Sequence, residues 1–131
     1  MSYLLDTSTL LEILRASPPP ALVRRLSQVP ARDRWTSVIT VSQLLLAARR
    51  EQEPRLMQDV VRLVAAIRVA PYDLSAAQVF AKFRASIGKN CETDDVMIAA
   101  IASSRDYTLV TRRRGEFERF ALRLEDWTIG Q

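Results

Sequence analysis

The sequence contains no histidine, one cysteine and only three glycines. Without histidine, Ser-His and Cys-His nucleophile chemistry is excluded, and carboxylates remain the chief ionisable candidates for catalysis near neutral pH. With Cys91 alone, the chain cannot form an internal disulfide, which is typical of an intracellular protein. No Gly-x-Gly-x-x-Gly follows the first apolar run, which excludes a dinucleotide-binding turn. We therefore expect carboxylate chemistry.

Long apolar runs are absent too, and none approaches the roughly 20 residues of a membrane span. At the start of the chain, an acid interrupts the apolar residues before the core of a signal peptide could form. These two observations predict a cytoplasmic protein with no membrane partner.

Acidic residues are outnumbered by basic ones, which gives a formal net charge of +4. Of the 19 basic residues, all but Lys82 and Lys89 are arginine. Arginine makes two-pronged contacts with phosphate or carboxylate, so the excess indicates nucleic acid or an acidic protein segment as a partner. An ordinary solvated basic surface is the alternative interpretation.

The length of 131 residues is that of one domain, and we expect a single domain over 1–131. Short apolar runs predict strands over 3–5, 35–39, 67–69 and 108–111, with a further edge strand over 122–128. Helical spacing and capping residues predict helices over 9–15, 21–28, 40–50, 54–66, 73–87 and 93–102. Strands that alternate with helices favour an α/β fold with three layers, α/β/α, around a mostly parallel sheet.

Three acids fall where the ligand crevice of such a sheet is expected, at the carboxyl ends of the strands. Asp6 ends the first strand, Asp95 lies in the first turn of an apolar helix, and Glu116 follows the last core strand. Singly, Asp6 could make an Asx turn and Asp95 could cap a helix. Together, two carboxylates about 4 Å apart repel by about 1 kcal/mol in water and about 4 kcal/mol at an effective dielectric of 20. A convergent cluster therefore favours a hard divalent cation, Mg²⁺ or Mn²⁺.

Three segments carry a resemblance to a known family: Leu4 to Ser8, Asp95 to Ala100, and Leu109 to Thr111 followed by Glu116-Phe117. Together they resemble the PIN-domain family, and VapC-type toxins in particular, over nearly the whole chain. The resemblance implies a Mg²⁺-dependent endoribonuclease that cuts RNA. It also implies a cognate, VapB-like antitoxin as the silencing partner and often a homodimer of toxins.

The resemblance also assigns roles to individual residues. It implies that Asp6, Asp95 and Glu116 are catalytic and hold the metal, with position 43 as the fourth member of the site. It further implies supporting hydroxyls from Thr7 or Ser8 and from Thr111. Apart from the resemblance, Asp94 and Glu92 lie near enough to Asp95 in the sequence to serve as auxiliary ligands. The run Arg112, Arg113 and Arg114 is expected to grip RNA phosphates, with an ordinary solvated turn as the alternative.

Two positions depart from the family pattern. Gln43 stands where relatives normally carry glutamate, so one negative charge is missing, and we expect at least a ten- to hundredfold loss of metal affinity or activity. A naturally degenerate site and a deliberate exchange that disarms a toxic protein both fit this glutamine, and Thr40-x-x-Gln43 also fits a helix capping box. Arg113 stands where relatives often have asparagine. Gln43 is the feature that favours the alternative function, a catalytically inactive module that binds RNA or an antitoxin peptide.

Two further expectations concern the early helices and the cysteine. We expect an apolar surface that includes Leu10, Leu14 and Leu22 to bind the antitoxin. Cys91 is expected to be inert, because no histidine or second cysteine is available to activate it.

Overall fold

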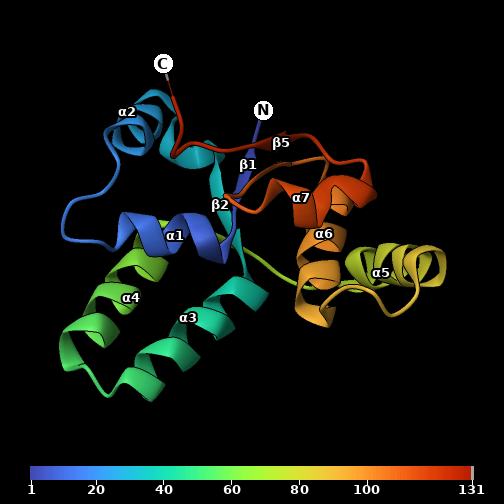
Figure 1. Ribbon diagram of the computed structural model, residues 1–131, viewed down its shortest axis with the longest axis horizontal. Helices are drawn as coiled ribbons and strands as arrows, with labels where there is room; N and C mark the ends of the chain where they lie inside the picture. The colour runs from blue at the N-terminus through green and yellow to red at the C-terminus, as the bar shows by residue number, and fades with distance from the viewer. Residues whose placement is uncertain (131) are drawn as a thin grey trace.

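The computed structural model describes residues 1–130, in which five short strands form one sheet between two groups of helices (Figure 1). The strands run in the order β3-β2-β1-β4-β5, and each neighbouring pair within the described residues is parallel. Their bounds are β1 Tyr3–Leu5, β2 Arg34–Ser37, β3 Arg68–Ala70, β4 Thr108–Val110 and β5 Leu124–Glu125. The expected parallel α/β/α architecture is confirmed, and the edge strand predicted near the end of the chain is β5.

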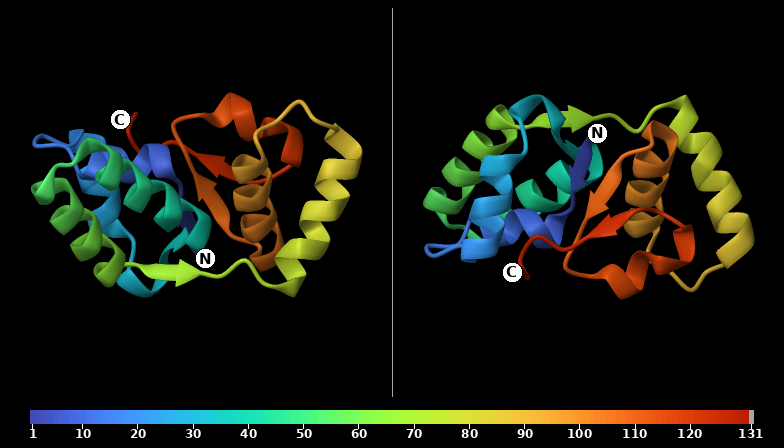
Figure 2. Two further views of the ribbon diagram at one scale, coloured as in Figure 1. Left: turned by 90° about the horizontal axis from the view of Figure 1, so that it is seen from below. Right: turned by 90° about the horizontal axis from the view of Figure 1, so that it is seen from above.

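The helices divide between the two faces of the sheet, as the views from below and above also show (Figure 2). One face carries α1 Thr7–Ile13, α2 Pro20–Gln28, α3 Val38–Glu51 and α4 Pro54–Ala66. The other carries α5 Leu74–Ile87, α6 Thr93–Arg105 and the short α7 Arg114–Phe117. Two 3-10 turns, Ala31–Asp33 and Glu118–Phe120, complete the described elements. Over residues 1–130, even the longest helices, α3 and α5 with 14 residues each, are too short to cross a membrane.

Two hydrophobic cores lie on either side of the sheet because successive strand residues point to opposite faces. Leu4 and Leu109 pack into the core beneath α5 and α6, whereas Leu5 and Val110 pack into the core beneath α1 to α4. All four side chains are fully buried. The two central strands are therefore fixed from both faces, and the residues that follow them start from a rigid position.

Several predicted boundaries were wrong by two or three residues, and capping explains the shifts. The first helix begins at Thr7, because the side chain of Asp6 accepts a hydrogen bond from the backbone N–H of Thr9. The second strand ends at Ser37, whose hydroxyl accepts from the backbone N–H of Thr40, so α3 begins at Val38. For the helix that carries Asp95, Thr93 or Asp94 was the expected cap. The structure shows instead that α6 begins at Thr93 and that its N-cap residue is Glu92.

The expected apolar surface on the early helices is corrected by the structure. Leu10 and Leu22 are 1% and 0% exposed, because they belong to the core that includes Leu44 and Val60. Leu14 is partly buried against the same core. These three leucines stabilise the packing of α1 and α2, so they cannot form a docking surface.

Candidate active site

Asp6 lies at the carboxyl end of β1, where it is fully buried and also caps α1. Its Oδ1 accepts hydrogen bonds from the Ser8 hydroxyl at 2.7 Å and from the Thr9 backbone N–H at 3.0 Å. Its Oδ2 accepts from the Thr111 hydroxyl at 2.5 Å. Both oxygens are thus held in place, and the Asp6 carboxylate has one orientation at the junction of β1 and β4.

The same two hydroxyls tie the segment after β4 to Asp6. Ser8 Oγ accepts from the backbone N–H of Arg112 at 3.0 Å, and Thr111 Oγ1 accepts from the backbone N–H of Arg113 at 2.9 Å. The hydroxyls of Ser8 and Thr111 therefore lie beside the first acid, where the sequence placed them. They also fix the backbone from which the arginine run starts.

Asp95 lies in the first turn of α6, with its side chain only 6% exposed. Arg113 binds both of its oxygens, with Nη2 donating to Oδ1 at 2.8 Å and Nη1 donating to Oδ2 at 3.2 Å. The Arg113 guanidinium also lies 5.5 Å from the centre of the Phe117 ring. The pair is a two-pronged, charge-assisted contact, the strongest kind of side-chain hydrogen bonding.

Gln43 lies inside α3 and links two other helices. Its amide oxygen accepts from the hydroxyl of Thr7, and its amide nitrogen donates to Asp94 Oδ2 at 3.0 Å. The predicted capping box is wrong, because Ser37 rather than Thr40 caps α3 and the Gln43 amide bonds to other helices. In Figure 1 the first turns of α1 and α3 meet near the centre of the molecule with α6 beside them, and Gln43 joins all three.

Glu116 is exposed on α7 and faces the loop between α5 and α6. It shares a hollow of about 350 Å³ with Lys89, Cys91 and Glu92. This places Glu92 close to Glu116, whereas Gln43 bonds to Asp94. The third acid of the predicted set thus approaches the site from solvent, unlike buried Asp6 and Asp95.

The negative charges of the three acids all act on the guanidinium of Arg113, although of these acids, all within the described residues, only Asp95 contacts it. Its pKa is raised first by the hydrogen bonds to Asp95, then by the negative charges of Asp95, Asp6 and Glu116, against a lowering effect of burial. Each predicted metal acid therefore acts on one cation. The structure brings the three acids into a common electrostatic field with Arg113 inside it.

The donor atoms suit a hard divalent ion, because carboxylate oxygens are the ligands that Mg²⁺ prefers. In the described structure, however, the oxygens of Asp6 and Asp95 are bonded to protein groups instead. Among residues 1–130, no three acidic, cysteine or histidine side chains are gathered closely enough to hold a metal ion. Both oxygens of Asp95 are bonded to Arg113, and both oxygens of Asp6 accept hydrogen bonds. A metal would have to displace the guanidinium before it could bind Asp95.

The two neighbours of Arg113 have different surroundings. Arg112 pairs with Glu12 Oε2 at 3.4 Å, while Arg15 pairs with Glu12 Oε1 at 2.9 Å. The Glu12 side chain is only 11% exposed, so it anchors the arginine run to α1. Sequence reasoning missed Glu12, because only the fold brings it beside Arg112.

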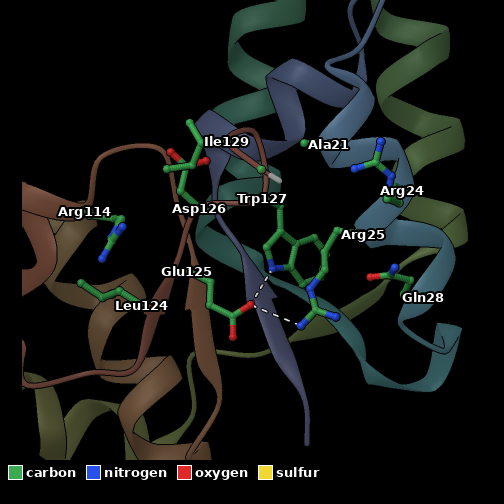
Figure 3. A pocket seen from close by; sticks show the side chains of 11 residues that line it. Ala21, Arg24, Arg25, Gln28, Arg114, Leu124, Glu125, Asp126, Trp127 and Ile129 are labelled. Carbon is green, nitrogen blue, oxygen red and sulfur yellow. Dashed lines mark hydrogen bonds and ion pairs between the residues drawn. The ribbon is translucent and has the colours of Figure 1, made fainter.

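Arg114 is exposed and lines a separate hollow of about 510 Å³ between α2 and the C-terminal segment (Figure 3). In that hollow the Arg25 guanidinium lies 5.2 Å from the Trp127 ring centre, and Glu125 accepts hydrogen bonds from both side chains. None of the predicted metal acids lines it. This hollow is therefore distinct from the acidic site.

Cys91 is a free, partly buried thiol near the acids. Burial raises its pKa, and the charges of Asp95 and Glu116 raise it further, while Arg119 and Arg84 act in the opposite direction. The thiol is therefore protonated at neutral pH, which is the unreactive form.

Comparisons with known proteins give one consistent result. The sequence model of the PIN domain matches residues 3–122. Toxin FitB of Neisseria gonorrhoeae is 33% identical over 125 residues, which cover 87% of this chain and 89% of that protein. The DNA-bound VapBC structure from Salmonella typhimurium superposes with a TM-score of 0.87 at 30% identity, over 97% of this chain and 98% of the other. VapBC-1 from nontypeable Haemophilus influenzae gives a TM-score of 0.86 at 26% identity, over 98% of this chain and all of the other. The chain belongs to the PIN domain family.

Proposed function

We propose that this protein is a Mg²⁺- or Mn²⁺-dependent endoribonuclease and the toxin of a VapBC-like toxin–antitoxin pair. The observation that carries the proposal is that Asp6 and Asp95 are buried at the end of β1 and in the first turn of α6, and that their charges, with that of Glu116, act on Arg113. Three carboxylates that act on one cation form a site in which positive charge is strongly favoured. Membership of the PIN domain family supports the assignment to RNA cleavage.

Different residues of the chain have different roles in the proposed reaction. Buried Asp6 keeps one orientation through its bonds to Ser8 and Thr111, so it offers a fixed acceptor at the edge of the site. The exposed run Arg112 to Arg114 attracts the phosphates of RNA, and this attraction weakens as the salt concentration rises. A divalent ion held by the acids would supply the Lewis acid and the activated water that phosphodiester hydrolysis needs.

The proposal includes two protein partners and a cytoplasmic site of action. The solved VapBC and FitAB structures that resemble this chain are complexes, which supports a cognate antitoxin. With Leu10 and Leu22 in the core, the exposed apolar side chains of α1, α2 and α3 become the candidate contacts, among them Leu11, Val23 and Leu46. A second copy of the toxin is the other partner. Co-expression with the neighbouring gene product should give one peak in size-exclusion chromatography, and two separate peaks would contradict the antitoxin proposal.

A second candidate function is a binding module without turnover. It is favoured by Gln43, which has an amide where the family pattern has an acid. The amide oxygen accepts a hydrogen bond from Thr7, and the amide nitrogen donates one to Asp94. Such a site would keep the arginine run for RNA while lacking a full set of metal ligands.

One pair of variants separates the two candidates. Metal binding is measured by calorimetry with Mg²⁺ and Mn²⁺, and RNA cleavage is assayed at the same metal concentrations. Gln43→Glu should increase metal-dependent cleavage by tenfold or more, and adding Asp6→Ala should abolish it. Gln58→Glu on the exposed face of α4 makes the same chemical change away from the site and should leave cleavage unchanged. Metal binding by the Gln43→Glu protein without cleavage would favour the binding module instead.

A further inference from the structure

We propose that Arg113 is the exchangeable cation of the acidic site: it neutralises Asp95 while no metal is bound, and it transfers to a substrate phosphate when the metal takes its place. This inference rests on the proposed function, because it assumes that the same acids receive a divalent ion. It explains why a chain with the right donor atoms presents no gathered metal site in residues 1–130.

The first step of the argument is that Asp95 cannot remain alone. Its side chain is 6% exposed, and its helix carries a nearly continuous buried face from Val96 to Ala102. An unpaired buried carboxylate is costly, so a cation must accompany it in every state of the protein. Arg113 fills that need with both prongs of its guanidinium, at 2.8 and 3.2 Å.

The second step is that Arg113 is the partner that can leave. Its side chain is 42% exposed, in contrast to that of Asp95. The backbone N–H of Arg113 is fixed by Thr111, so the side chain can swing while its starting point stays in the site. Moving it toward solvent breaks the bonds to Asp95 and the ring contact with Phe117.

The third step is that the role belongs to Arg113 and not to the arginine run as a whole. Arg112 is paired with Glu12, which belongs to α1 and is not one of the predicted metal acids. Arg114 turns to the separate hollow beside α2. Among residues 1–130, Arg113 is the arginine of this run that hydrogen-bonds a predicted metal acid.

The exchange couples the two ligands of the site. A metal on Asp95 releases a guanidinium that can bind phosphate, and a phosphate that captures the guanidinium frees Asp95 for the metal. By thermodynamic reciprocity, each ligand then raises the affinity for the other by the same factor. Arg113 thus makes metal binding depend on the presence of substrate.

The test is a Mn²⁺ titration without RNA of four proteins: the wild-type chain, R113N, R113K and R114N. Binding is measured by calorimetry and by the electron paramagnetic resonance signal of free Mn²⁺. R113N should bind Mn²⁺ at least about tenfold more tightly than wild type, because the competing cation is gone. R114N removes the same charge from the next residue but leaves Asp95 paired, so its affinity should change much less. R113K keeps the charge without the two-pronged contact and should fall between. Equal affinities of R113N and R114N, or no Mn²⁺ binding by any of the four proteins, would overturn the inference.

A second titration tests the coupling, with a short single-stranded oligodeoxythymidylate as the source of phosphates. The oligonucleotide should tighten Mn²⁺ binding to the wild-type chain more than to R113N, and equal tightening would contradict the exchange. RNA cleavage is assayed separately, so the two proposals fail separately. Tight Mn²⁺ binding by R113N without cleavage by any variant would contradict the nuclease proposal and support the exchange. Cleavage by wild type, with the Mn²⁺ affinity of R113N equal to that of wild type, would support the nuclease proposal and contradict the exchange.

Discussion

Replacing Gln43 by glutamate is expected to destabilise the metal-free protein and to make its stability depend on Mg²⁺. The amide nitrogen of Gln43 donates to Asp94 Oδ2 at 3.0 Å, and its amide oxygen accepts from Thr7. A glutamate at this position can still accept from Thr7, but it has no hydrogen to donate. Its second oxygen would therefore face the Asp94 carboxylate directly.

The expected cost follows from the charges and the lost bond. Two carboxylates about 4 Å apart repel by about 1 kcal/mol in water and by about 4 kcal/mol at an effective dielectric of 20. Because Asp94 is exposed, the lower end applies, and the lost hydrogen bond to a charged group adds about 1–2 kcal/mol. A total of about 2–3 kcal/mol corresponds to a fall in Tm of roughly 6–12 °C for a domain of 131 residues.

The assay is urea unfolding of wild type, Gln43→Glu and Gln43→Glu/Asp94→Asn, each with and without Mg²⁺. The double variant restores one donor and one acceptor in reversed order, so it should recover most of the metal-free stability. Mg²⁺ should stabilise Gln43→Glu more than it stabilises wild type. At a Mg²⁺ concentration of a hundred times the Kd of the variant, the free energy of unfolding of the variant should rise by about 2.7 kcal/mol. The reasoning would be refuted if Gln43→Glu unfolded at the same urea concentration as wild type without metal.

Two further predictions concern the surroundings of the acids. Thr111→Val should lower the free energy of unfolding by about 1–3 kcal/mol, because Asp6 Oδ2 and the backbone N–H of Arg113 both lose a buried partner, while Thr111→Ser should cost much less; equal losses in urea unfolding would contradict this. The Cys91 thiol should alkylate slowly with iodoacetamide at pH 8, and Asp95→Asn should accelerate the reaction, because removing that negative charge lowers the pKa of Cys91; a rate that is unchanged or slower would show that burial alone holds the thiol protonated.

The sheet and the acids on it could be predicted from sequence because both leave strong local signals. The apolar runs that became β1 and β4 are fully buried on both faces, so their composition depends little on the rest of the chain. Polar residues interrupt each run where the strand ends, as Asp6 and Thr111 do. In a parallel sheet, that local rule already places the side chains at one edge.

The boundaries of helices and strands were harder to predict where the local composition and the capping residue favour different structures. The stretch from Thr36 to Val41 is rich in β-branched residues, which favour strands, yet α3 begins at Val38. The hydroxyl of Ser37 settles the boundary by accepting from Thr40, and the next two turns pack Leu44 and Ala48 into the core. Packing on the sheet therefore outweighs the local preference of Val38 and Ile39.

The partners of charged and amide side chains could not be predicted, because they depend on contacts between distant segments. Arg113 and Asp95 are 18 residues apart, and Gln43 and Asp94 are 51 apart. In the sequence, Glu12 and Arg15 look like an exposed pair on one helix, whereas the fold buries Glu12 and adds Arg112 to it. Only the assembled sheet decides which opposite charges meet.

The central position of β1 has a consequence for how the protein is made. Strand β1 is synthesised before its two neighbours, β2 and β4, and its register with β4 joins Tyr3 to Thr108 and Leu5 to Val110. During most of translation, the nascent chain carries Asp6 without the strand that completes its surroundings. Such pairing between distant segments forms late and slowly. Any activity that depends on the surroundings of Asp6 is therefore withheld until β4 has been synthesised and has paired with β1.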